Sequence, residues 1–194
     1  MNKIPAVLLL LCILSCSERQ GAENNKSSSD SLDVQLEKFE SRKRYSSFTK
    51  DILASIPDAG IEQAIVDYVY DYVLAGDPVA NHAAFKKISP GLRAVYSTIV
   101  LEELVGSGGF AQYFDEPESL FIEEAVEGFR LLGAPVASRI ARRAMVIVRV
   151  SGKSGTVDDR LSPLDAEFYG SSEPTGAMRI RFIRKNPSMF ITKN

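Results

Sequence analysis

The sequence predicts an all-α domain, and three observations support this prediction. Beyond residue 48, apolar residues recur at intervals of three and four, the spacing of one face of a helix. Gly and Pro punctuate these segments at positions typical of helix ends. The stretches "VIVRV" and "RIRFI", which could form strands, lack a hairpin turn beside a matching partner. We therefore expect a single compact multi-helix domain over residues 48–194, after a cleaved signal peptide and a flexible tether.

Residues 1–15 have the layout of a secretory signal peptide. "MNKIPAVLLLLCILSC" starts with Lys3, continues as an apolar run to Leu14 and ends in Ser15 and Cys16. Its last four residues, "ILSC", resemble the bacterial lipobox. The resemblance implies that the Cys16 thiol is acylated with diacylglycerol and that the chain is cut before it. The alternative is a plain signal peptide or signal anchor with an incidental cysteine.

Cysteine usage favours the lipoprotein interpretation. The two cysteines are Cys12 and Cys16, so the exported part has no pair left for a disulfide. Each buried methylene of an acyl chain contributes about 0.8 kcal/mol, and two or three chains would anchor the protein firmly to the membrane. We expect a lipid-anchored protein of the bacterial cell envelope. Ser17 stands where an aspartate would favour inner-membrane retention, so the outer membrane is preferred.

Residues 16–47 are expected to be the lipidated cysteine followed by a disordered tether. They are rich in Ser, Asn, Lys and Glu, and such a composition buries too little surface to offset its ordering entropy. Part of this stretch, "DVQLEKFESRKRY", has the alternative of a short helix. The formal net charge of the chain is −2, and it becomes −3 when the segment with Lys3 is removed. This balance does not indicate nucleic-acid binding.

The first two helices of the domain are predicted from periodicity and capping residues. "GIEQAIVDYVYDYVLAG" reads as a helix with Gly76 as its C-terminal cap, and Asp77 and Pro78 prevent its continuation. "ISPGLRAVYSTIVLEELV" reads as the next helix, with Ser89 as N-cap and Pro90 at the first helical position.

Glycines then interrupt the apolar pattern, and we expect a helix junction there. Gly108 and Gly109 precede three aromatic residues, Phe110, Tyr113 and Phe114, which one helical turn would direct toward the same core. We predict that both glycines are structural and that at least one has a positive φ, which favours glycine.

The rest of the domain is predicted to form four further helices and one loop. "PESLFIEEAVEGFRLLGAP" is a helix that Gly133 stops, and Pro135 starts the helix "PVASRIARRAMVIV". A polar loop is expected over residues 149–160, and "SPLDAEFYG" and "GAMRIRFIRKN" are expected to form two shorter helices.

The sequence contains no recognisable catalytic, metal or cofactor motif. "SGKSGT" ends like a phosphate-binding loop, but Ile147 stands where that motif needs a glycine. His82 is the only histidine, which excludes a metal site built on two histidines, and we interpret it as a loop or cap residue. A Ser-His-Asp triad using His82 has no supporting serine motif. Neighbouring carboxylates such as Glu123 and Glu124 diverge by about 100° on a helix. We expect no enzyme, no catalytic residue, no metal and no cofactor.

Charge is segregated along the chain. Between Ala94 and Phe129 there are acids and no bases: Glu102, Glu103, Asp115, Glu116, Glu118, Glu123, Glu124 and Glu127. From there to Val157 the balance inverts: Arg130, Arg139, Arg142, Arg143, Arg149 and Lys153. One explanation is pairing across packed helices, with Arg139, Arg142 or Arg143 as partners of the glutamates. The other is an acidic face, represented by Glu116, Glu123 and Glu127, that binds a basic protein.

Several motifs together resemble the C-terminal domain of the bacterial DNA-mimic protein family. They are "GGFAQYF", "FRLLGAP", "ASRIARRAM", "LDAEFYG" and "RFIRKNPSMF". The resemblance implies an all-helical, often dimeric domain in which the two glycines form a tight turn above the three aromatic residues, with Gln112 as its polar member. The family usually has Asn before the glycines, where this chain has Ser107.

The function expected from these features is protein binding at the cell envelope. The activity of the family, presenting acidic side chains in place of DNA phosphates, requires a strongly acidic surface and a cytoplasmic partner, whereas this chain is nearly neutral and predicted to be exported. We expect a membrane attachment through Cys16, a protein partner, a homodimer as one assembly, and no nucleic acid. The alternatives are an envelope hydrolase with an unrecognised active site, or a DNA-mimic-type regulator if the chain is not exported.

Overall fold

The structure is a computed structural model that describes residues 37, 40–151 and 158–192. The signal peptide expected at residues 1–15, Cys16 and most of the expected tether lie outside these residues, as does nearly all of "SGKSGT". A compact helical unit begins at Arg44. Within the described ranges every regular element is a helix, which confirms the all-α prediction. The two stretches with a strand alternative, residues 146–150 and 179–183, are both helical.

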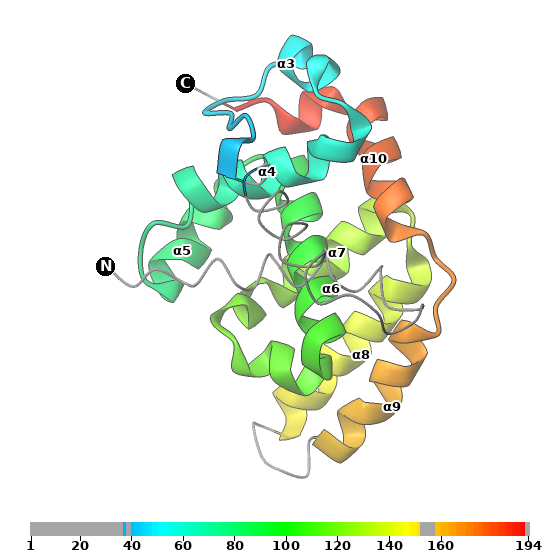
Figure 1. Ribbon diagram of the computed structural model, residues 1–194. Coiled ribbons are helices and arrows are strands. Elements are labelled where there is room, and N and C mark those ends of the chain that lie inside the picture. The colour runs from blue at the N-terminus through cyan, green and yellow to red at the C-terminus, as the bar shows by residue number, and fades with distance from the viewer. Residues whose placement is uncertain (1–36, 38–39, 152–157, 193–194) are drawn as a thin grey trace, which may run out of the picture. The chain divides into compact units, whose positions relative to one another are not determined.

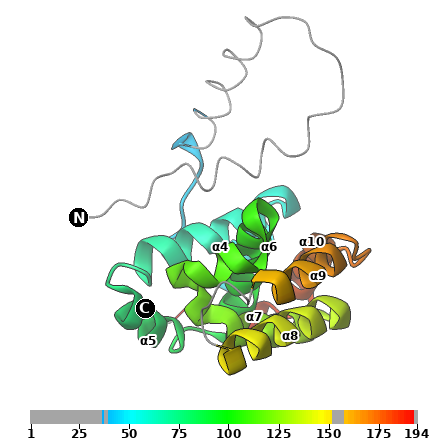
Figure 2. The ribbon, with the colours of Figure 1, turned by 90° about the horizontal axis from the view of Figure 1, so that it is seen from below.

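The helical unit is organised around one long helix, α6. The elements, in chain order, are α3 (Lys50–Ser55), α4 (Asp58–Tyr72), α5 (Pro78–Phe85), α6 (Pro90–Asp115), η1 (Pro117–Phe121), α7 (Ile122–Leu132), α8 (Pro135–Ser151), α9 (Asp158–Tyr169), α10 (Thr175–Lys185) and η2 (Pro187–Phe190). Helix α6 contacts α4, α7, α9 and both 3-10 helices, and α8 packs on α7 and α9 (Figures 1 and 2). The central position of α6 therefore brings residues from distant parts of the chain together.

Helices α6 and α7 pack closely because a glycine faces α6. A Cβ at Gly128 would lie 2.8 Å from the carbonyl oxygen of Ala94 and 2.9 Å from Cγ2 of Thr98. Burial on α7 follows the predicted period, since Ala125 and Phe129 are fully buried. Glu123 and Glu127 are consequently exposed on its outer edge.

The C-terminal 3-10 helix, η2, packs on the first turn of α6. A Cβ at Gly91 would lie 2.6 Å from the carbonyl oxygen of Met189, so the two backbones meet at the glycine. Beyond η2, Thr192 donates its backbone N–H to the carbonyl of Phe48 at 3.2 Å. The Phe48 N–H donates to Oγ1 of Thr192 at 2.9 Å. These bonds hold the last described residues against the start of the helical unit.

The end of the first predicted helix was placed wrongly, and a helix was missed after it. Helix α4 ends at Tyr72 with Val73 as its C-cap, not at Gly76. Asp77 and Pro78, interpreted as a stop signal, start α5 instead, because the Asp77 carboxylate accepts from two backbone N–H groups of the first turn. His82 is therefore a helical residue and not a loop or cap residue.

Two other local expectations also differ from the structure. The polar loop expected over residues 149–160 is wrong at both ends, since α8 continues to Ser151 and α9 begins at Asp158. Ser89 is the N-cap residue of α6, but its side chain makes no capping hydrogen bond. The Ser89 hydroxyl is buried without a hydrogen-bond partner.

Candidate functional site

The break in α6 lies at the two glycines. Gly108 has φ −162° and ψ 20°, and Gly109 has φ 78° and ψ −180°. The first φ is extended backbone that any residue adopts, whereas the conformation of Gly109 is essentially restricted to glycine. The side chain of Gln112 folds back over Gly108, where a Cβ would lie 1.7 Å from its Oε1 atom. The two glycines therefore have different roles, and of the two only Gly109 has a backbone conformation that requires glycine.

Two residues of α9 satisfy the backbone groups that this break exposes. Asp165 Oδ1 accepts a hydrogen bond from the Phe110 N–H at 2.8 Å, and the Tyr169 hydroxyl donates to the carbonyl oxygen of Val105. Asp165 and Tyr169 are four residues apart and so share one face of α9. One face of a distant helix thus caps the beginning of the second half of α6 and the end of the first half.

The aromatic residues after the glycines form the core beneath the junction. Phe110, Tyr113 and Phe114 are all buried. The ring centroids of Phe110 and Phe168 of α9 are 5.5 Å apart in an edge-to-face arrangement. The Tyr113 hydroxyl donates to the backbone carbonyl of Glu118 at 3.2 Å, and burial raises the pKa of this hydroxyl far above its usual range.

Ser107, which occupies the place of the usual asparagine of the family, bonds within its own helix. Its hydroxyl donates to the carbonyls of Glu103 at 3.1 Å and Leu104 at 3.0 Å. It therefore helps to close the first half of α6.

The three acidic residues chosen from the sequence do not behave alike. Glu123 pairs with Arg149 of α8 at 2.5 Å, and Glu127 pairs with Arg130 of its own helix at 2.5 Å. Hydrogen bonding to these guanidinium groups lowers the pKa of both glutamates. Glu116 stands at the turn between α6 and η1 and makes no ion pair within the described part of the chain.

The arginines expected to pair with these glutamates have a different main partner. Arg139 Nη2 lies 3.6 Å from a carboxylate oxygen of Glu167 on α9, and Arg143 binds the other oxygen of the same carboxylate. Arg139 and Arg143 are therefore wrong as the partners of Glu123 and Glu127, whereas pairing across packed helices is present between Glu123 and Arg149. Arg142 acts on Glu127 at longer range, where its charge contributes to the lowered pKa.

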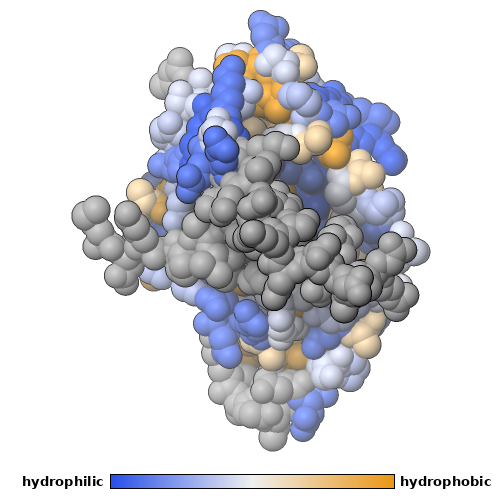
Figure 3. All heavy atoms as spheres, viewed as in Figure 1, coloured by the Kyte–Doolittle hydropathy of each residue, from blue (hydrophilic) through white to orange (hydrophobic). Residues whose placement is uncertain are grey.

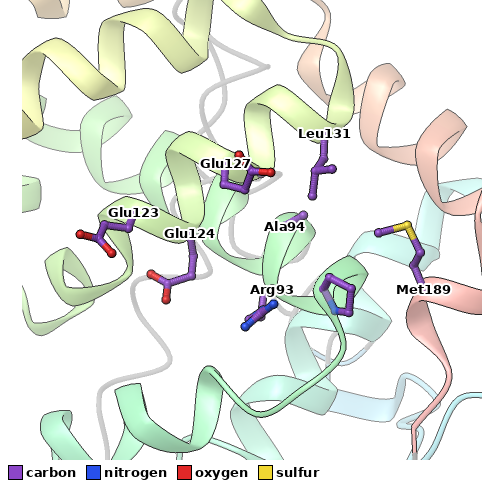
Figure 4. A pocket seen from close by; sticks show the side chains of 9 residues that line it. Arg93, Ala94, Glu123, Glu124, Glu127, Leu131 and Met189 are labelled. Carbon is purple, nitrogen blue, oxygen red and sulfur yellow. The ribbon is translucent and has the colours of Figure 1, made fainter.

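Glu123 and Glu127 border a pocket between α7, the first turn of α6 and η2. Its volume is about 370 Å³, and its lining includes Arg93 and Ala94 of α6, Glu124 and Leu131 of α7, and Met189 of η2. Figure 4 shows the side chains of α7 along one side of the pocket, with Arg93 and Met189 reaching it from the two other elements. The pocket combines carboxylates with an apolar wall, which suits an amphipathic cation.

Three buried polar atoms among the described residues have no hydrogen-bond partner, and one of them belongs to a residue of this pocket. They are Nε2 of His82, Oγ of Ser89 and Oε2 of Glu124. Glu124 lines the pocket, its side chain is 10% exposed, and its Oε1 lies 3.5 Å from His82 Nε2. Ser89 directly precedes the lining residue Pro90. Buried polar atoms are nearly always satisfied, so the unpartnered Glu124 oxygen marks a place where a hydrogen-bond donor belongs.

A second charged cluster joins α4, α6 and α10. Arg179 is 6% exposed and binds Glu62 through Nε and Glu102 through Nη1, the latter at 2.6 Å. Burial alone would lower the pKa of this guanidinium, but the two carboxylates outweigh it and raise the pKa. The cluster ties three helices together around a shallow pocket of about 250 Å³. A buried Arg with two carboxylates is most simply a structural element.

Several of these residues were missed from the sequence. Asp165 and Tyr169 stand in the quoted motif "LDAEFYG", and their spacing of four was the available signal. Arg93, Glu124 and Arg179 carry no local signal, because their partners come from other helices.

In the part of the chain that the structure describes, no group of three or more His, Cys, Asp or Glu residues is placed to hold a metal ion. No helix among the described residues is long and apolar enough to cross a membrane.

A family model described as DMP19-like protein matches residues 86–186, more than half of the 194 residues. The chain belongs to this family. No curated protein and no solved structure matches the chain. The DMP19-like region contains the junction glycines, the α9 residues that cap them and the α6 and α7 walls of the pocket. Met189, on the third wall, lies just beyond it. The family assignment therefore covers both the structural junction and most of the candidate binding site.

Proposed function

We propose that this chain is a lipid-anchored protein of the bacterial cell envelope whose DMP19-like helical domain binds a basic protein. The observation that carries the proposal is the acidic pocket edge formed by Glu123, Glu124 and Glu127 of α7. Glu116 precedes them at the turn between α6 and η1, and Glu123 and Glu127 are exposed, each beside one arginine. Exposed carboxylates of this kind favour positive charge. Such complementarity steers association and selects partners.

The placement of the carboxylates supports binding rather than catalysis. Glu102 is held by Arg179 and Glu123 by Arg149, so neither is poised as a general acid or base. Glu123 is mostly exposed whereas its neighbour Glu124 is nearly buried, and the two do not converge on one reacting atom. We propose no envelope hydrolase and no cofactor.

The proposed location rests on the N-terminal sequence. Cys16 follows a lipobox-like ending, and the mature chain has no other cysteine. Membrane attachment would come from acyl chains on Cys16, with the outer membrane preferred. The nearly neutral formal charge of −2 distinguishes this chain from a protein that imitates DNA over its whole surface.

On the side of the molecule shown in Figure 3, the coloured surface is mostly hydrophilic, and its hydrophobic areas are separated from one another. Obligate interfaces are larger and more apolar. A homodimer, the assembly expected from the family resemblance, is therefore tested separately by light scattering of the purified protein at several concentrations.

The proposal is tested by reversing the acidic edge. Cells expressing the protein are treated with a crosslinker, and crosslinked proteins are compared between wild type and the triple variant Glu116→Lys, Glu123→Lys, Glu127→Lys. We expect a basic partner to be lost from the variant while its helical content is unchanged, since surface pairs contribute at most about 1 kcal/mol each. Capture should also weaken with salt, because exposed charges are screened over about 8 Å at physiological ionic strength.

The matched control reverses three exposed acids elsewhere, Glu40→Lys, Asp51→Lys and Asp159→Lys, and so makes the same change in net charge. The control should keep the partner. Loss of the partner from both variants would mean that net charge, and not this edge, determines binding. Unchanged capture by the triple variant would place the binding surface elsewhere.

A further inference from the structure

We propose that the pocket between α6, α7 and η2 receives one lysine side chain of the protein partner, with the ammonium group bound by Glu124. This inference rests on the proposed function and names the chemistry of the contact. The proposed function involves a charged edge of α7, and the pocket beside that edge would bind one particular side chain of the partner. Glu123 and Glu127 would guide the partner, and Glu124 would select the residue that enters.

Glu124 is the carboxylate with unused binding capacity. Glu123 and Glu127 already have arginine partners. The Glu124 side chain is 10% exposed, and its Oε1 has only a 3.5 Å approach from His82. Its Oε2 is buried without a hydrogen bond. A buried acceptor of this kind has lost its water without gaining a donor, so a charged donor that reaches it binds favourably.

The arginine that lines the pocket, Arg93, binds a backbone carbonyl group. Arg93 lines the pocket, but its Nη1 donates to the carbonyl oxygen of Lys86 at 2.7 Å. No ion pair joins Arg93 to Glu124 in the described structure. Neither Arg93 nor the 3.5 Å approach of His82 gives Oε2 of Glu124 a hydrogen bond, so this oxygen can accept one from a partner.

The apolar wall fits the stem of a lysine. Pro90, Ala94, Leu131 and Met189 line the same pocket as Glu124. Figure 4 shows Leu131 on α7 and Met189 on η2, with Met189 extending toward the start of α6. A lysine places four methylenes against such a wall while its ammonium group binds a polar end.

The ammonium group also matches the unpartnered atom of the pocket. Lysine has three donors and no acceptor, and Oε2 of Glu124 accepts hydrogen bonds. An anion would meet three carboxylates at this pocket, and an uncharged apolar group would leave Glu124 unsatisfied. These two classes of occupant fit less well than a long primary amine.

The test titrates the full-length chain, purified in detergent, with acetyl-Ala-Lys-Ala-amide by calorimetry. The matched peptide contains norleucine, which keeps the stem and removes the charge. We expect the lysine peptide to bind. The norleucine peptide should bind at least about tenfold more weakly, because loss of a hydrogen bond between charged groups lowers the affinity by about a factor of ten or more. Glu124→Gln keeps the shape of the side chain and should weaken the lysine peptide by a similar factor. Leu131→Ala should weaken both peptides.

Three results would overturn the inference. The first is equal binding of the lysine peptide by wild type and Glu124→Gln, with circular dichroism showing both to be folded. The second is equal binding of the lysine and norleucine peptides. The third is binding of free butylammonium without binding of the peptide, which would indicate a small-molecule site. If Glu124→Gln keeps the crosslinked partner that the triple reversal loses, the proposed function stands and this inference fails.

Discussion

Replacing Gly109 by alanine should destabilise the helical unit by about 2–5 kcal/mol, and the structure gives two separate reasons. A non-glycine residue at φ 78° and ψ −180° costs on the order of 1–3 kcal/mol. In addition, the new Cβ would lie 2.6 Å from Oδ2 of Asp165, which must then move. That movement weakens the hydrogen bond from the Phe110 N–H, and a bond to a charged acceptor is worth about 1.5–3 kcal/mol.

A matched control lies three residues earlier in the same helix. Gly106 is helical and exposed, and a Cβ there meets nothing within 4 Å. Gly106→Ala should therefore stabilise the protein by about 0.5–1 kcal/mol, because alanine loses less backbone entropy in a helix. The two substitutions add the same methyl group, so opposite signs would isolate the effect of the junction.

The two contributions at Gly109 are separable by a double-mutant cycle with Asp165→Ala. Removing the carboxylate relieves the clash and leaves the backbone strain, so Gly109→Ala should cost less in the Asp165→Ala background. The assay is urea unfolding at pH 7, with thermal midpoints as a check, where 1 kcal/mol corresponds to about 2–4 °C for a chain of this size. Equal midpoints for Gly106→Ala and Gly109→Ala would refute the junction, and a cost unchanged by Asp165→Ala would refute the contact with α9.

Three further predictions concern other parts of the chain. Cys16→Ser should abolish labelling by a fatty-acid analogue in cells, and a labelled, membrane-held variant would contradict the lipoprotein interpretation. Phe110→Ala should cost roughly 3–5 kcal/mol in urea unfolding, because the ring is fully buried; a loss below 1 kcal/mol would contradict that packing. Burial raises the pKa of Glu118, so its ionisation reduces stability as pH rises from the unfolded value of about 4.3. Glu118→Gln should be more stable than wild type at pH 7 and equal to it near pH 3. If the variant and wild type are equally stable at both pH values, the pKa of Glu118 is not raised by burial.

Much of the secondary structure follows from local chemistry. The apolar spacing in "IEEAVEGFRLL" predicts α7 because one face of that helix must be buried. Gly133 ends it with φ 80°, as a left-handed C-cap glycine should. Asp77 and Pro78 show the limit of this reasoning. The same pair is compatible with the end of one helix and the start of another, and sequence alone did not separate the two meanings.

The sequence by itself determined the helical class, the family and the position of the break at Gly108 and Gly109. The helical class and the break depend on residues that act within a few positions of one another along the chain, and the family is recognised from short motifs spread over the domain. Only the tertiary structure decided which groups close that break and which charges remain available for binding. Asp165 reaches the junction from 55 positions away, and Arg149 reaches Glu123 from 26. Hydrogen bonds and ion pairs depend on distances of about 3 Å in space, and helix packing sets those distances independently of separation along the chain.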